Sequence, residues 1–141
     1  MASKIVSPTP EALLQNYKEI IGGGTPEDFR EILPEKNLCT LISVGKLFED
    51  REAIAVDFLG LLRKAYTDIK LVEESSEIRM INGETALIIF GYHTECHKRD
   101  TGEPYGIKGL ETQVAIREQG SWKLAHVHYS KVEGWNWNEQ M

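Results

Sequence analysis

Histidines and carboxylates in the second half of the chain have the spacing of groups that could do acid–base chemistry. His126 and His128 are separated by one residue, and His93 and Glu111 precede them in two neighbouring segments. A histidine beside a carboxylate titrates near neutral pH and suits proton transfer. The His-x-His spacing also puts two imidazoles on one face of a strand, where a metal ion could bind. No HExxH, paired Cys-x-x-Cys, Gly-x-Ser-x-Gly or phosphate-loop sequence accompanies them, so we expect neither a metal nor another cofactor.

The elements that must position these residues are strands. Strand patterns cover residues 69–80, 84–97, 107–118 and 121–131, and turn sequences separate them at 82–83, 100–104 and 119–120. Four consecutive strands with short turns predict an antiparallel meander. Upstream, helical spacing of apolar residues predicts helices over 10–21, 25–33 and 50–66, and residues 38–46 predict a strand or hairpin arm. Helices followed by strands indicate an α+β fold, with the helices packed on one face of a curved sheet.

The predicted turns fix an expected register, and the register decides which side chains share a face of the sheet. A tight turn at residues 119–120 puts Gln113 opposite His126 and Glu111 opposite His128, and the turn near 101–103 puts His93 near Glu111. One face then collects the polar set His93, Glu95, Glu111, Gln113, Arg117, Trp122, His126 and His128. The other face collects Ala86, Ile88, Phe90, Tyr92, Thr112, Val114, Ile116, Ala125, Val127 and Tyr129.

The polar face has three interpretations. Its side chains satisfy one another or water in a half-exposed sheet. Alternatively, they line a cleft between the sheet and the helices, where converging polar groups orient a small ligand. The third interpretation, which has the least support, is a metal site built from the two His-x-His imidazoles with His93 and Glu111.

Length and composition exclude several classes of protein. The 141 residues suffice for one domain, 1–141, with terminal segments at 1–9 and 132–141. A net charge of −6 argues against nucleic acid and anionic membranes as partners. No secretory or membrane-spanning pattern is present, and the isolated Cys39 and Cys96 fit reduced thiols, so we expect a cytoplasmic protein.

The predicted sheet has more apolar surface than the predicted helices can cover. Leu87 and Ile89 make the run 86–90 apolar on both faces. Three helices are too few to cover both faces of such a sheet. We therefore expect a homodimer formed through the sheet.

Three sequence segments resemble a known superfamily. Glu111-Thr-Gln-Val114, Gly120-Ser-Trp122-Lys-Leu124 and His126-Val-His-Tyr-Ser130 are similar to strands and turns of the nuclear transport factor 2-like superfamily. The likeness is strongest to SnoaL-like domains and to the association domain of calcium/calmodulin-dependent protein kinase II, and it runs from about residue 48 to 130. It implies a cone-shaped half-barrel with a cystatin-like fold: helices in the concavity of a curved antiparallel sheet, a pocket at the open end, and a homodimer or larger assembly.

The same resemblance implies a small-molecule pocket. At positions where the kinase association domain has pocket arginines, this chain has His93, Gln113 and Tyr129, which favours a neutral, hydroxylated or carbonyl ligand over an acidic one. The superfamily includes isomerases, cyclases and dehydratases. If the chain is such an enzyme, we expect His93 or His126 as its catalytic base, with Tyr129 or Gln113 polarising a carbonyl. Glu111 and His128 complete the expected ligand-binding set. The alternative is a non-catalytic oligomerisation module.

Overall fold

All the long strands follow the helices along the chain, and two short strands lie between the second and third helical segments, as the sequence predicts. The computed structural model describes residues 5–135 and residue 137. Its helices are α1 (Pro10–Gly23), α2 (Pro26–Glu31), the π-helix η1 (Ala53–Phe58) and α3 (Leu59–Ala65), which continues η1. The strands are β1 (Thr40–Ser43), β2 (Lys46–Phe48), β3 (Tyr66–Asn82), β4 (Thr85–Lys98), β5 (Pro104–Tyr105), β6 (Lys108–Glu118) and β7 (Ser121–Val132).

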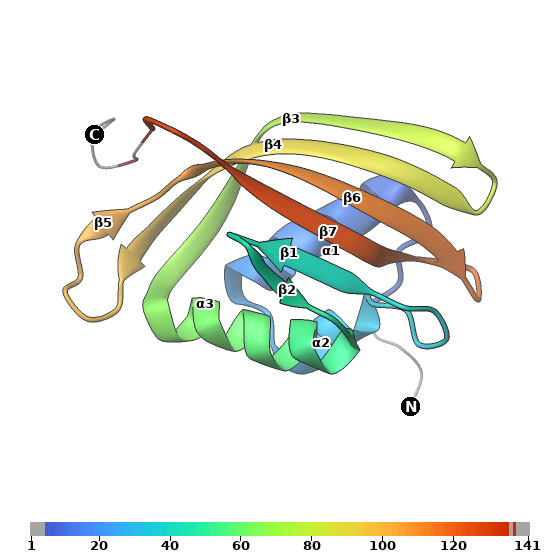
Figure 1. The fold of residues 1–141 in the computed structure, drawn as a ribbon, viewed down its shortest axis with the longest axis horizontal. Helices are drawn as coiled ribbons and strands as arrows, with labels where there is room; N and C mark the ends of the chain where they lie inside the picture. The colour runs from blue at the N-terminus through green and yellow to red at the C-terminus, as the bar shows by residue number, and fades with distance from the viewer. Residues whose placement is uncertain (1–4, 136, 138–141) are drawn as a thin grey trace.

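The strands form a single curved sheet in the order β2-β1-β7-β6-β4-β3, with β5 paired to β4. The long strands β3, β4, β6 and β7 form the predicted antiparallel meander. The short pairing of β1 with β7 is parallel, and the sequence pattern did not predict it. Figure 1 shows the long strands arching over the helices, so the sheet has a concave face toward them and a convex face away from them. This confirms the α+β half-barrel expected from the sequence.

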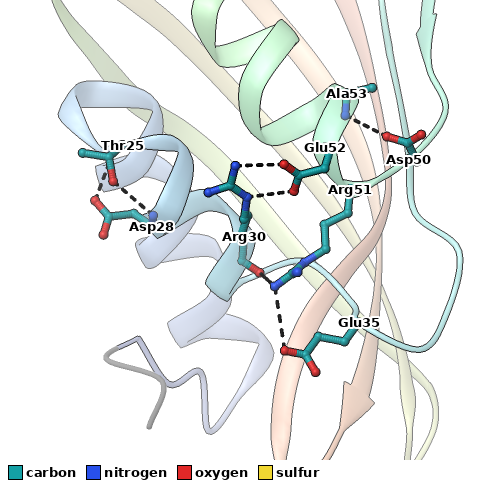
Figure 2. A network of polar contacts seen from close by, with 8 residues as sticks. All are labelled: Thr25, Asp28, Arg30, Glu35, Asp50, Arg51, Glu52 and Ala53. Carbon is teal, nitrogen blue, oxygen red and sulfur yellow. Dashed lines mark hydrogen bonds and ion pairs between the residues drawn. The ribbon is translucent and has the colours of Figure 1, made fainter. Parts of the chain in front are cut away.

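Side-chain contacts fix α2 against the start of the η1–α3 helix (Figure 2). Thr25 and Asp28 form a capping box that starts α2, with each side chain accepting a hydrogen bond from the other's backbone amide. Arg30 then makes a bidentate ion pair with Glu52, with Nε–Oε2 at 2.7 Å and Nη2–Oε1 at 2.8 Å. Arg51 donates to the carbonyl of Arg30 at 2.9 Å. These contacts join α2 to the residues that begin η1.

The core fills the space between α1, α2 and the concave face. Alternate residues of β4 point into it, and all of them from position 86 to 92 are buried. The largest fully buried side chains come from both layers: Tyr17, Phe29, Phe90, Leu13, Ile32, Leu33, Leu41, Ile54, Leu59, Ile88, Leu124 and Gln113. Among the described residues, no helix has the length and apolar character needed to cross a membrane.

The predicted register of β7 is wrong by one residue along its second half. Gln113 lies opposite Val127 instead of His126, and Glu111 lies opposite Tyr129 instead of His128. The prediction for β4 also fails, because Phe90 and not His93 lies opposite Glu111.

A β-bulge at Ala125 causes the change of register in β7. Val114 pairs with His126, but the next residue of β6, Ala115, pairs with Leu124, so Ala125 is an extra residue on β7. One extra residue reverses the side on which every following side chain points. The bulge therefore sends His126 and His128 to the convex face and leaves Val127 and Tyr129 on the concave face.

Candidate functional site

A cavity of about 350 Å³ opens between the concave face and the helices α1, η1 and α3. Much of its wall is apolar and comes from Ile21, Leu41, Val44, Phe58, Leu62, Ile69, Leu71, Ile107 and Val127. All five tyrosines of the chain also line it, namely Tyr17, Tyr66, Tyr92, Tyr105 and Tyr129. An apolar cavity with a few converging polar groups is the usual form of a small-molecule site.

Glu111 is the acidic residue of this wall, and its carboxylate accepts three hydrogen bonds. The Tyr17 hydroxyl donates to Oε1 at 2.9 Å, and the Tyr92 hydroxyl donates to the same oxygen at 3.2 Å. The Gln113 amide nitrogen donates to Oε2 at 3.0 Å. Tyr17 comes from α1, whereas the other three residues come from β4 and β6, so the cluster joins the helix layer to the sheet.

Burial gives Glu111 an unusual proton affinity. Only 3% of the residue is exposed, and desolvation raises the pKa of its carboxyl to about 7 although all three hydrogen bonds act to lower it. Desolvation and the nearby Glu111 charge raise the pKa of the Tyr17 and Tyr92 hydroxyls well above the ordinary value, so both stay neutral donors. A carboxyl group that titrates near neutral pH can both take up and release a proton.

Gln113 is placed to stabilise either protonation state of Glu111. Its side-chain oxygen is buried and has no hydrogen-bond partner among the described residues. Rotating the amide by half a turn would present that oxygen to Oε2 of Glu111. A protonated Glu111 carboxyl could then donate its hydrogen to the amide oxygen. The ionised carboxyl uses the amide nitrogen instead.

The remaining tyrosines surround the outer part of the cavity. Tyr66 stacks on Tyr105 with ring centroids 5.3 Å apart, and the ring of Tyr129 lies 6.4 Å from that of Tyr92. Burial is the main cause that raises the pKa of Tyr66, to about 12, and the pKa of Tyr129 also rises. The phenols of Tyr66 and Tyr129 are therefore neutral hydrogen-bonding groups at physiological pH.

Gly109 makes room for this arrangement. A Cβ atom at this position would lie 2.7 Å from Cζ of Tyr92 and 2.8 Å from Cε1 of Tyr129. The two rings can pack over the β6 backbone only because Gly109 carries no side chain.

The structure brings together three of the six residues expected to form the site. Glu111 and Tyr129 line the cavity, and Gln113 lies behind Glu111 and is fully buried. Gln113 is therefore not itself part of the cavity wall; it contacts the cavity through the Glu111 carboxyl.

The other three predicted site residues, all histidines, lie on the convex face. His93 places Nδ1 2.8 Å from a Glu74 oxygen and Nε2 2.7 Å from a Glu95 oxygen. Nδ1 of His126 lies 2.6 Å from the Thr40 hydroxyl. The expectation that one polar face gathers the histidines with Glu111 is wrong, because the bulge and the β4 register separate them across the sheet. A catalytic role for His93 or His126 stays a prediction.

His128 is exposed on the same convex face. Its ring centroid lies 6.4 Å from that of His126. In the described part of the chain, no group of three or more His, Cys, Asp or Glu side chains has a metal-binding arrangement.

Sequence reasoning missed the two tyrosines that bind Glu111. Tyr17 lies in the predicted helix 10–21, and Tyr92 lies on the predicted apolar face. One pattern did carry information about the site. Trp122, Leu124, Val127 and Tyr129 are apolar or aromatic, and the three-residue step from 124 to 127 requires a bulge if all four face the core.

Comparison with known proteins gives results for the fold alone. No family model matches the sequence, and no curated protein does. A nuclear transport factor 2-like superfamily protein from Salmonella enterica serovar Typhimurium LT2 superposes with a TM-score of 0.78 at 23% identity, covering 87% of this chain and 92% of that chain. A protein with a cystatin-like fold from Caulobacter vibrioides gives 0.74 at 24% identity, covering 88% and 87%.

A third similar structure is an enzyme. The hexachlorocyclohexane dehydrochlorinase LinA-type3 from Novosphingobium barchaimii LL02 has a TM-score of 0.69 at 12% identity, with 87% of each chain covered. Similarity at this level of identity extends to the arrangement of elements and not to the residues of a site. The chain therefore has the nuclear transport factor 2-like, or cystatin-like, fold.

Proposed function

We propose that this protein binds a small, largely apolar molecule in the tyrosine-lined cavity and that Glu111 transfers a proton to or from it. The observation that carries the proposal is the buried Glu111 carboxyl in the cavity wall, held by the Tyr17 and Tyr92 hydroxyls. Its pKa of about 7 suits a group that accepts a proton from carbon and returns it.

The cavity also has donors for an oxygen that gains negative charge. Removing a proton beside a carbonyl makes an enolate, which neutral hydroxyl donors stabilise in a water-poor site. The hydroxyl of Tyr66 or of Tyr129 can serve as such a donor, because both line the cavity and burial keeps both phenols neutral. The reaction class that fits is isomerisation, cyclisation or elimination through an enolate, and the fold is shared with a dehydrochlorinase.

A simple ketone tests this proposal. 2-Tetralone is a mostly apolar bicyclic ketone with acidic protons beside its carbonyl, and proton exchange in D₂O can be followed by NMR. We expect the wild-type protein to accelerate deuterium incorporation at those carbons. The variant Glu111→Gln should retain 2-tetralone binding, because the amide keeps an acceptor for both tyrosines, and should lose the accelerated exchange.

The control is Glu95→Gln, which removes a carboxylate from the convex face. This variant should exchange deuterium as fast as wild type. Accelerated exchange that survives in Glu111→Gln would show that Glu111 does not transfer the proton. Failure of 2-tetralone and related ketones to bind would contradict the proposal that the cavity is a small-molecule site.

We further propose that the convex face forms a homodimer. Leu110 is 46% exposed there, near the start of β6, and the half-buried Ile89, Leu87 and Val114 continue the apolar surface along β4 and β6. An apolar stripe across the central strands of a sheet favours burial against a second copy.

Sedimentation velocity tests the dimer. Wild type should sediment as a dimer and Leu110→Asp as a folded monomer, whereas Leu61→Asp on α3, a residue of similar exposure, should stay dimeric. A wild-type monomer would rule the assembly out. A dimer that persists in Leu110→Asp would move the interface elsewhere.

A further inference from the structure

The outer end of the cavity carries a positive charge that the Glu111 cluster does not use. Lys131 is the basic residue among the described residues that line the cavity. No described acidic side chain forms an ion pair with it, although acidic residues outnumber basic ones 22 to 16 in the chain. A lysine that stays unpaired in an acidic protein leaves its charge available to a ligand.

Tyr129 supplies a free donor next to this charge. It lies two residues before Lys131 on β7, so the two side chains share the concave face, with their Cα atoms about 7 Å apart. The Tyr17 and Tyr92 hydroxyls are engaged with Glu111, whereas the Tyr129 hydroxyl has no hydrogen-bond partner among the described residues. Because burial raises the pKa of its phenol, Tyr129 remains a donor.

Lys131 lies at the same level of the sheet as the rings of Tyr92 and Tyr129. It pairs across the sheet with Gly109, over which both rings pack. Deeper in the cavity, the next pair on the same face is Tyr129 with Glu111. From Lys131 to Tyr129 and the Glu111 that pairs with it, the wall therefore changes from a cation to a free phenol and a carboxyl group. Apolar side chains such as Leu71 and Ile107 belong to the same lining.

We propose that the cavity binds a small amphipathic monocarboxylate, with its carboxylate on Lys131 and Tyr129 and its apolar body directed toward Glu111. This rests on the proposed small-molecule cavity and specifies its ligand. One ammonium and one phenol match a group of single charge, whereas the second charge of a phosphate would meet no further cation. Glu111 repels an anion from the inner end, which sets the direction of entry.

A pair of probes that differ only in the acid group tests the inference. Isothermal titration with 3-phenylpropionate and with 3-phenyl-1-propanol separates recognition of the carboxylate from burial of the apolar body. We expect wild type to bind the acid about fivefold more tightly than the alcohol. A difference in affinity of this size is typical of one partly exposed ion pair. Lys131→Met should bring the ratio to about one without changing the affinity for the alcohol, and Tyr129→Phe should lower it.

Lys70→Met is the matched control, because Lys70 is an exposed lysine of β3 that does not line the cavity. It should keep the wild-type ratio. Equal affinities for acid and alcohol in wild type, or an unchanged ratio in Lys131→Met, would overturn the inference while leaving the cavity's assignment intact. Tighter binding of 3-phenylpropylphosphonate than of 3-phenylpropionate would also overturn it. Failure of all three probes to bind would count against the cavity as well.

Discussion

Glu111 on the concave face and Glu74 on the convex face each have several polar partners, yet their acidities shift in opposite directions. Glu74 contacts His93 at 2.8 Å and Lys108 at 3.1 Å, and these hydrogen bonds lower the pKa of its carboxyl. Glu111 has three neutral donors, and burial raises the pKa of its carboxyl. The number of partners is therefore a poor guide, whereas solvent access and the charge of the partners decide the direction.

This difference separates two kinds of polar cluster in one sheet. The convex cluster is solvated and holds the Glu74 carboxylate ionised, as surface ion pairs do. The concave cluster keeps a carboxyl near its titration point inside an apolar cavity, which is the condition for proton transfer. Proton chemistry is expected where the tyrosines are and not where the histidines are.

The largest expected effect is the pH dependence that Glu111 gives to stability. The pKa of its carboxyl is about 7 in the folded state against 4.5 for the free side chain. At a pH between these two values, the unfolded state has therefore already lost the proton that the native state keeps. The free energy of unfolding of wild type relative to Glu111→Gln should therefore fall as pH rises from about 4.5 to 7, by on the order of 3 kcal/mol. Urea denaturation of both proteins at several pH values measures it, and a constant difference would refute the burial argument.

The next effect concerns the packing of the tyrosines. Gly109→Ala puts a Cβ within 2.8 Å of the Tyr92 and Tyr129 rings, and we expect it to lower the free energy of unfolding by about 1–3 kcal/mol. Gly83→Ala is the control, since a Cβ there meets nothing within 4 Å. Equal stabilities of the two variants would mean that the rings move aside without cost.

Glu74 should show a smaller effect of the opposite sign. Because the pKa of Glu74 is lowered in the folded state, the stability that it contributes is present above about pH 4.5 and is lost as the pH falls. The free energy of unfolding of wild type relative to Glu74→Gln should decrease on acidification by a few tenths of a kcal/mol. The same sign as for Glu111 would show that the two faces do not differ in the way described.

The smallest expected effect is that of His126. It lies across the sheet from the cavity, so His126→Ala should leave the deuterium exchange of 2-tetralone unchanged. This measurement also tests the sequence-based expectation of a histidine base directly. Loss of exchange in His126→Ala would restore the histidine to the mechanism and contradict the separation of the two faces.

The elements of the fold were predictable because their ends have local causes. Thr25 and Asp28 mark the start of α2 by capping, and Asn82-Gly83 and Gln119-Gly120 mark the hairpin turns. The resemblance to nuclear transport factor 2-like proteins supplied the curved half-barrel, which the structure confirms. The pairing of β1 with β7 was not predictable, because the strand patterns of two segments so far apart in sequence do not indicate which strands pair.

The site was only partly predictable for a related reason. Glu111 and Gln113 were identified as polar residues of a strand, but which groups they meet depends on register, and the bulge at Ala125 reverses the faces of the residues that follow. The partner from α1, Tyr17, comes from tertiary packing and has no local signature. Sequence alternation thus located the strand that carries the carboxyl but not the side chains around it.

The gathering of every tyrosine around one cavity has a spectroscopic consequence. The indoles of Trp122, Trp135 and Trp137 do not line that cavity, so the phenol part of the near-ultraviolet spectrum comes from its wall alone. A ligand that enters should perturb the phenol bands near 275–285 nm while leaving indole emission largely unchanged. The protein thus carries its own optical reporter of occupancy, without any added label.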